Sequence, residues 1–163
     1  MDTRLNMFNN KSNKSQDAPA KSALEIIAEY SSALVSGDNL TMDSLRAQDF
    51  ELDFVQRDAF DSNPLSNEET KTFWPDWFSA FPQRDYHVTR TIAGEEVVVT
   101  QWAFSGTHLG PLSHPIFGEP IEATGKTICF RGISVYDVKN GLVHRETTYM
   151  DLSTLFVELD ITV

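Results

Sequence analysis

The stretch Trp102-Ala-Phe-Ser-Gly-Thr-His-Leu-Gly-Pro-Leu112 is the most informative part of this 163-residue chain. Large apolar and small residues alternate along it, as in a β-strand, and His108 follows between Gly106 and Gly110. Because side chains on a strand point to alternate sides, Trp102, Phe104, Gly106 and His108 share one face. Two aromatic rings, the space left by a glycine and a titratable imidazole ring are suited to the wall of a small-molecule pocket. Taken alone, however, the stretch favours an ordinary core strand with a structural histidine.

Strand patterns continue on both sides of this stretch and predict an antiparallel sheet. Turn signals at Ala93-Gly94 and Asn140-Gly141 join them in pairs, and Asn-Gly is the strongest short hairpin signal. A long loop over residues 109–125 separates the two pairs, and a loop of that length is often functional. The predicted strands are Tyr86–Ile92, Glu96–His108, Lys126–Val138 and Leu142–Met150.

Helical patterns dominate the first half of the chain. An apolar stripe from Ala23 onward, ended by Gly37, predicts a first helix. The sequence Ser66-Asn-Glu-Glu69 fits a capping box that opens a further helix, with aromatic residues on one side and Pro75 expected to kink or interrupt it. The remaining predictions are a short helix around Met42–Ala47, a strand over Phe50–Arg57, a loop at Asp61–Pro64 and a final amphipathic helix over Leu152–Leu159. This order predicts an α+β domain with helices on one face of a curved sheet.

Composition and charge exclude several classes of protein. A formal charge of −11 argues against nucleic-acid binding and against docking to an anionic membrane. A single cysteine, Cys129, excludes an intrachain disulfide, and its apolar surroundings predict a buried thiol. No apolar run suits a membrane span and the N-terminus lacks a secretory pattern, so a cytoplasmic protein is expected. We expect a flexible tail over residues 1–17 and a single domain over residues 18–163.

With this order of elements, the chain resembles the SnoaL-like polyketide cyclases, within the nuclear transport factor 2-like superfamily. The resemblance spans approximately residues 23–159. It rests on Trp102-x-Phe-x-Gly-Thr-His-x-Gly-Pro-Leu112, Thr124-Gly-Lys126, Arg131-Gly-Ile-Ser-Val-Tyr136, Asn140-Gly141 and Glu146-x-x-Tyr-x-Asp-Leu152. It implies a cone-shaped fold in which a curved antiparallel sheet wraps around the N-terminal helices and leaves a deep apolar pocket. It also implies an enzyme without metal or organic cofactor, and a homodimer formed through the outer face of the sheet.

The resemblance also indicates which catalytic groups differ. In the best-understood branch an aspartate near the end of the last strand performs the acid/base work of an aldol ring closure. Aligning Asn140-Gly141 and Asp151-Leu152 places that aspartate at Thr148, and a histidine of the preceding strand falls at Ser134. The histidine of the Gly-x-His motif is kept, as His108. The altered positions count against the antibiotic-cyclase mechanism.

The residues around these positions suggest another catalytic set. Strand alternation places Glu146 and His144 on the same face as Thr148. A glutamate buried among aromatic rings has a raised pKa and becomes a general base or acid near neutral pH. We therefore expect a His108–Glu146 pair, with Asp53 as a third member that orients His108 or binds substrate. The expected substrate-binding residues are Trp74, Trp77, Phe78, Trp102, Phe104, Arg131, Ser134, Thr148 and Phe156.

Each catalytic candidate has a structural alternative. Glu146 pairs equally well with Arg131 on the neighbouring strand as an ordinary buried ion pair. His108 serves as well to hydrogen-bond the loop over residues 109–125, and Asp53 suits a surface position. No His-x-x-x-His or similar spacing is present, so no metal site is expected.

The predicted function is cofactor-independent acid/base catalysis of the cyclase, isomerase or dehydratase type on an apolar carbonyl or polyketide-like compound. One alternative is a non-catalytic protein that binds an apolar ligand. Another is an epoxide-hydrolase-like enzyme, in which Asp53, Arg131 and Glu146 would imitate an Asp–Arg–Asp set. Apolar side chains on both faces of residues 97–99 and 133–135 predict that a second copy of the chain covers the outer face of the sheet.

Overall fold

The computed structural model describes residues 20–55 and 63–160. The predicted tail over residues 1–17 and the first half of the predicted Asp61–Pro64 loop lie outside the described residues. The elements, in chain order, are α1 (Ala23–Ser36), α2 (Asn39–Ser44), β1 (Arg46–Phe54), β2 (Leu65–Ser66), α3 (Asn67–Ala80), β3 (Gln83–Ala93), β4 (Val97–Thr107), the 3₁₀ turn η1 (Pro115–Phe117), β5 (Thr127–Lys139), β6 (Leu142–Met150) and α4 (Leu152–Leu159).

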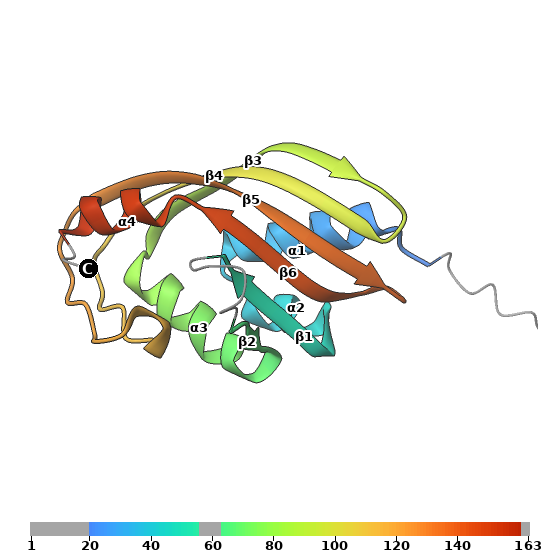
Figure 1. Ribbon diagram of the computed structural model, residues 1–163, viewed down its shortest axis with the longest axis horizontal. Coiled ribbons are helices and arrows are strands. Elements are labelled where there is room, and N and C mark those ends of the chain that lie inside the picture. The colour runs from blue at the N-terminus through green and yellow to red at the C-terminus, as the bar shows by residue number, and fades with distance from the viewer. Residues whose placement is uncertain (1–19, 56–62, 161–163) are drawn as a thin grey trace, which may run out of the picture.

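The strands form one curved sheet in the order β2-β1-β6-β5-β4-β3. Strands β3 to β6 form an antiparallel meander joined by the two predicted hairpins. The sheet is not antiparallel throughout, because β1 lies parallel to β6. Figure 1 shows strands β3–β6 arching over the helices, with α4 at one end of the arch. The predicted α+β class and curved sheet are confirmed.

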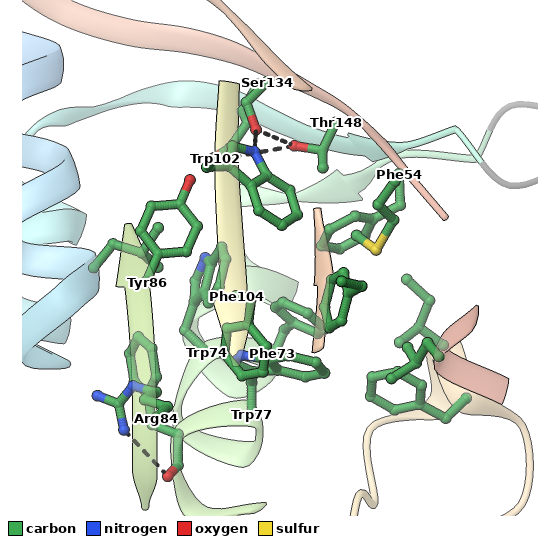
Figure 2. A pocket seen from close by; sticks show the side chains of 18 residues that line it. Phe54, Phe73, Trp74, Trp77, Arg84, Tyr86, Trp102, Phe104, Ser134 and Thr148 are labelled. Atoms are coloured by element: carbon green, nitrogen blue, oxygen red, sulfur yellow. Dashed lines mark hydrogen bonds between the residues drawn. The ribbon is translucent and has the colours of Figure 1, made fainter. Parts of the chain in front are cut away.

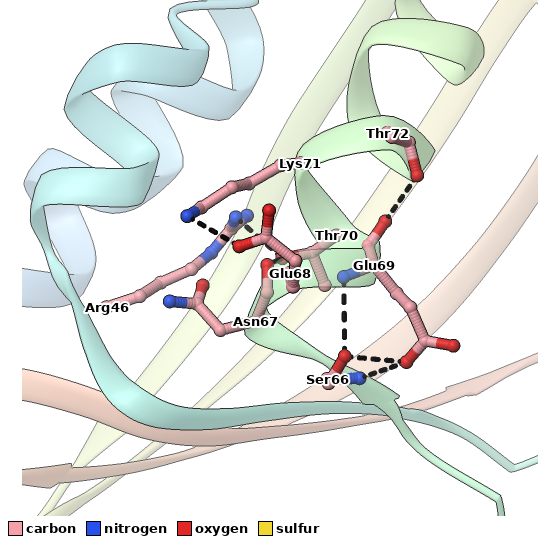
Figure 3. Close-up of polar contacts among 8 residues, drawn as sticks. All are labelled: Arg46, Ser66, Asn67, Glu68, Glu69, Thr70, Lys71 and Thr72. Atoms are coloured by element: carbon pink, nitrogen blue, oxygen red, sulfur yellow. Dashed lines mark hydrogen bonds and ion pairs between the residues drawn. The ribbon is translucent and has the colours of Figure 1, made fainter.

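Local capping signals set the ends of the two long helices. Ser22 and Glu25 form a capping box at the start of α1, and Gly37 ends the helix in a left-handed conformation with φ 74°. Ser66 and Glu69 form the predicted capping box of α3 (Figure 3). Helix α3 continues through Pro75, so the expected interruption does not occur.

The second helix begins and ends three residues earlier than its pattern suggested. It ends at Ser44, and Arg46 and Ala47, predicted as helical, instead begin β1. The Val143 amide donates to the Leu45 carbonyl at 2.9 Å, so pairing with β6 stabilises the extended conformation here. Arg46 is thereby placed at the start of an inner strand, where its side chain is 6% exposed.

The hydrophobic core consists of two clusters beneath the sheet. One packs α1 and the middle of α3 against β1, the first residues of β4 and β6, and the last residues of β5. The other packs the end of α3 and helix α4 against the last residues of β4 and the first residues of β5. Trp77, Tyr86 and Phe117 contact both clusters, which indicates that the two cores meet along a shared wall of aromatic rings.

The opposite, outer face of the sheet carries exposed apolar side chains. Val97 is 42% and Ile133 is 40% exposed on this outer face. Cys129 is also exposed, so the predicted buried thiol is wrong: Ile128 and Phe130 point inward, and alternation turns Cys129 outward. Among the described residues, no helix is both long and apolar enough to cross a membrane.

Candidate active site

An apolar cavity lies where the two core clusters meet. Figure 2 shows its walls of aromatic rings, with Trp102 and Phe104 from β4 facing Trp74 and Trp77 from α3. Neighbouring rings are in contact, for example Trp77 and Phe104 with centroids 5.2 Å apart. The residues that line it are Leu34, Phe54, Phe73, Trp74, Trp77, Phe78, Arg84, Tyr86, Trp102, Phe104, Ile116, Phe117, Phe130, Ser134, Glu146, Thr148, Met150 and Leu155.

Glycine at position 132 allows Trp102 to form this wall. A Cβ atom built at Gly132 would overlap the six-membered ring of the Trp102 indole. The ring therefore occupies the space that a side chain on the neighbouring strand would fill. This places the indole N–H within reach of Ser134, two residues further along β5.

A short polar row runs along one end of the cavity on β5 and β6. The Trp102 Nε1–H donates to Ser134 Oγ at 3.0 Å, and Ser134 Oγ lies 2.8 Å from Thr148 Oγ1 (Figure 2). Thr148 Oγ1 donates in turn to Glu146 Oε1 at 3.2 Å. Glu146 is only 3% exposed, so a carboxyl group stands at the inner end of this row, shielded from water.

The second oxygen of Glu146 has its own partners, behind the cavity wall. The Tyr30 hydroxyl, from α1, donates to Glu146 Oε2 at 3.3 Å. Arg46 donates to the same phenol oxygen from Nε at 3.1 Å and from Nη2 at 2.8 Å. Its Nη1 donates to Thr70 Oγ1 at 3.1 Å, which ties the network to the first turn of α3 (Figure 3).

Burial dominates the electrostatics of this network. It raises the pKa of Glu146, while the Arg46 guanidinium and the hydrogen bonds from Thr148 and Tyr30 act in the opposite direction. Burial also raises the pKa of the Tyr30 phenol, and the nearby Glu146 charge adds to this. A carboxyl group with a raised pKa among neutral phenols is suited to exchange a proton near neutral pH.

Seven of the nine expected substrate-binding residues line the cavity: Trp74, Trp77, Phe78, Trp102, Phe104, Ser134 and Thr148. Arg131 does not. It is exposed on the outer face, because it lies three residues from the inward-facing Ser134 on the same strand. Phe156 does not line it either; on α4 its neighbour Leu155 does.

His108 lies apart from the cavity that Glu146 lines. It follows the last residue of β4, is fully buried and stacks on Phe81 with ring centroids 5.2 Å apart. Its Nδ1 accepts from the Thr124 amide at 3.3 Å and lies 3.1 Å from the Thr124 hydroxyl. Burial lowers its pKa. The arrangement matches the structural alternative, in which this histidine holds the loop over residues 109–125.

Asp53 also lies away from Glu146. The inward-facing neighbours Leu52 and Phe54 turn Asp53 toward the other face of β1, where its Oδ2 accepts from Arg145 Nη2 at 2.6 Å. The expected trio of His108, Glu146 and Asp53 is therefore not assembled. The same holds for the Asp53, Arg131 and Glu146 set of the epoxide-hydrolase alternative, and for the alternative Glu146–Arg131 ion pair.

A register shift in the last hairpin explains one further difference. Val143 and Glu146 are both buried although they are three residues apart, because the pairing of β5 with β6 shifts between Asp137 and Val138. His144 therefore does not share the face of Glu146, as simple alternation predicted, and its Nδ1 pairs with Asp49 at 2.9 Å.

The sequence analysis missed the inner half of the polar network. Tyr30 carries a usable signal, since it belongs to the apolar stripe of the first helix and had to be buried. Arg46 carries none, because its position at a helix-to-strand junction depends on pairing with a strand nearly a hundred residues away. The cavity residues Phe54, Phe73, Tyr86, Phe117 and Phe130 carry only the general signal of aromatic core positions.

Known proteins are similar to this chain in sequence pattern and in fold. The family model described as SnoaL-like polyketide cyclase matches residues 28–159. No match to this chain was found among curated proteins.

Solved structures with the same fold are only distantly similar in sequence. A SnoaL-like polyketide cyclase, so described, from Jannaschia sp. CCS1 is 14% identical, with a TM-score of 0.69, over 90% of this chain and 98% of that one. Wild-type IdmH from Streptomyces antibioticus, described as a polyketide cyclase, is 23% identical, with a TM-score of 0.65, over 84% and 97% of the two chains. An epoxide hydrolase of the LEH-like type from M. tuberculosis is 16% identical, with a TM-score of 0.57, over 82% and 86%. With the family model spanning most of the described residues, the chain belongs to the SnoaL-like polyketide cyclase family.

Proposed function

We propose that this protein is a cofactor-independent enzyme of the cyclase, isomerase or dehydratase type, acting on an apolar carbonyl or polyketide-like compound. The observation that carries the proposal is Glu146: of the described residues that line the cavity, it is the one carboxylate. It lies buried beside aromatic walls, with a raised pKa. These are the properties of a carboxyl group that exchanges protons with a bound substrate.

The cavity walls supply the binding side of the proposal. Aromatic faces favour a flat, apolar substrate, and we assign substrate contact to Trp74, Trp77, Phe78, Trp102 and Phe104. Ser134 and Thr148 stand beside Glu146 at the polar end, where a substrate carbonyl would find hydroxyl groups. We do not assign catalysis to His108 or Asp53, since the hydrogen bonds of both hold other parts of the fold.

Native mass spectrometry of the purified protein, followed by turnover of any compound that co-purifies, tests this function. We expect a bound apolar carbonyl compound that the wild type converts and that Glu146→Gln binds without converting. The matched control is Glu95→Gln, an exposed glutamate in the β3–β4 turn, which we expect to behave as the wild type. A ligand that is bound but never converted would instead support the non-catalytic alternative, an apolar-ligand carrier. Equal turnover by the wild type and Glu146→Gln would contradict the assignment of Glu146.

We further propose a homodimer formed through the outer face of the sheet, in the cytoplasm. The support for the dimer is the exposure of Val97 and Ile133 on neighbouring strands of that face. The net charge of −11 supports the location, because it disfavours docking to an anionic membrane.

A further inference from the structure

Arg84 brings a positive charge to the end of the cavity opposite Ser134 and Thr148 (Figure 2). It lies on β3, is half-buried, and is the one cation among the described residues that line the cavity. We infer that Arg84 binds a carboxylate group of the cavity's ligand through the edge of its guanidinium that carries Nε and Nη2. The inference rests on the proposed function, in which this ligand is the substrate, and narrows it to an apolar compound that carries an acid group.

One side of the Arg84 guanidinium is held by the end of α3. Its Nη1 donates to the carbonyl oxygens of Phe78, at 3.5 Å, and Phe81, at 3.2 Å. Its central carbon Cζ lies over the Phe78 ring, 4.1 Å from the ring centroid. These contacts fix the position and the plane of the guanidinium, so that a ligand meets a group that is already oriented.

The other side of the same guanidinium has donors without acceptors. Its Nε is buried and has no hydrogen-bond partner among the described residues. The described residues supply acceptors to Nη1 alone, so the Nη2 hydrogens are also free of partners within this part of the chain. Nε and Nη2 each direct one N–H outward from the same edge of the planar group, in parallel. This is the pair of donors that the two oxygens of a carboxylate accept together.

The charge of Arg84 has no counter-ion in the described part of the chain. No carboxylate there lies within ion-pair distance of it, whereas Arg145 pairs with both Glu51 and Asp53. Burial lowers the pKa of Arg84, and no neighbouring charge opposes this effect. Since an arginine stays charged in proteins, its burial without an anion costs free energy, and a bound carboxylate offsets that cost.

The surroundings of Arg84 favour a single carboxylate on a flat apolar compound. Among the described residues, no second arginine or lysine lines the cavity, so a doubly charged group such as a phosphate would be only partly neutralised. Phe78 lies between Arg84 and Trp74, and its ring stacks on Trp74 with centroids 5.7 Å apart. The apolar body of the ligand can therefore lie along aromatic rings while its carboxylate binds Arg84.

Calorimetric titration with 2-naphthoic acid and 2-naphthamide tests this subsite by binding alone. The two compounds share one flat apolar body, and only the acid is ionised at pH 7.5. At an ionic strength of about 0.15 M, we expect the wild type to bind naphthoate at least about tenfold more tightly than the amide. The net charge of −11 repels anions from the chain as a whole, so this preference requires a local cation.

Arg84→Met removes the charge and keeps a long unbranched side chain. It should weaken the binding of naphthoate at least about tenfold and change the binding of the amide by less than about threefold. Arg84→Lys keeps the charge without the paired donors and should give an intermediate preference. The matched control is Arg90→Met, at an exposed position of the same strand, which should keep the wild-type preference.

A wild-type protein that does not prefer the acid, or binds neither compound, would overturn the inference whether or not Arg84→Met folds. A preference for the acid that persists in folded Arg84→Met would overturn it as well. An Arg84-dependent preference in a protein that converts no carbonyl compound would support the carboxylate subsite and overturn the proposed function, so the two proposals can fail separately.

Discussion

Arg46 is the residue on which the buried polar network depends most. Its side chain is almost fully buried, donates three hydrogen bonds and packs over the rings of Tyr30 and Phe50. Removing a buried charge from such a network leaves its partners desolvated and unpaired. Arg46→Met should therefore lower the free energy of unfolding by about 3–5 kcal/mol, measured by urea denaturation at pH 7.

Arg90→Met provides the comparison, since Arg90 is exposed on β3. We expect it to change the free energy of unfolding by less than about 0.5 kcal/mol. Similar effects of the two substitutions would show that the Arg46 network does not stabilise the fold.

His108 should contribute to the stability of the fold in a pH-dependent way, through its neutral form. Its Nδ1 accepts hydrogen bonds only in the neutral form, and burial lowers its pKa. A histidine with a depressed pKa stabilises the fold above its ordinary pKa of about 6.5, and this stabilisation is lost as the pH falls through the folded-state pKa. His108→Phe should lower the free energy of unfolding by about 1 kcal/mol at pH 8, since the Thr124 amide loses its acceptor.

The difference in free energy of unfolding between the wild type and His108→Phe depends on pH. Its pH dependence shows whether His108 is neutral or protonated in the folded protein. In urea unfolding, the gap between wild type and His108→Phe should narrow between pH 8 and pH 5, because only the wild type loses the contribution of neutral His108. A gap that widens toward acid pH would mean that the folded protein binds a proton on His108, against the burial seen here.

At the scale of elements, the Asp76 side chain of α3 binds the backbone of the loop over residues 109–125. Both carboxylate oxygens of Asp76 accept from the Ser113 amide, at 2.9 and 3.2 Å, and Oδ2 also accepts from the His114 amide at 3.0 Å. Directly after this attachment, Ile116 and Phe117 line the cavity. The loop thus forms part of the binding wall, and Asp76 fixes its position.

Replacing Asp76 should loosen this wall locally. Asp76→Ala removes the acceptor of two amides, and we expect about 1–2 kcal/mol less protection from hydrogen exchange at Ser113 and His114. The surface variant Asp85→Ala should leave exchange in the loop unchanged. Unchanged hydrogen exchange at Ser113 and His114 in Asp76→Ala would mean that other contacts hold the loop.

Sequence patterns predict the elements well where the deciding contacts are local. The Ser66–Glu69 capping box and the Asn140-Gly141 turn each lie within a few residues, and both are confirmed. The parallel pairing of β1 with β6 and the register shift near Asp137 depend on distant segments, and both were missed. For the site, alternation placed Trp102 and Phe104 on one face and the resemblance pointed to Ser134 and Thr148; all four line the cavity. Strand alternation, applied to Arg131, predicts that its side chain faces away from the cavity.

At the scale of the whole molecule, the exposed apolar side chains of the outer face predict a dimer. In sedimentation equilibrium we expect a species of twice the 18.4 kDa chain mass. Ile133→Lys places a charge on the apolar outer face and should dissociate the dimer into monomers. Leu40→Lys, at an 85% exposed position on α2, should remain dimeric. A wild-type protein that stays monomeric at all concentrations would contradict the dimer.

The central claim is that Glu146 removes a proton from a carbonyl compound bound in the aromatic cavity. Deuterium uptake from D₂O at the carbons next to the carbonyl of 2-tetralone, an apolar bicyclic ketone, measures this step directly by mass spectrometry. The wild type should accelerate uptake above the buffer rate, and Glu146→Gln should slow it by at least about 100-fold, the contribution typical of a positioned general base. Uptake that is equal in the wild type, Glu146→Gln and buffer would contradict the claim.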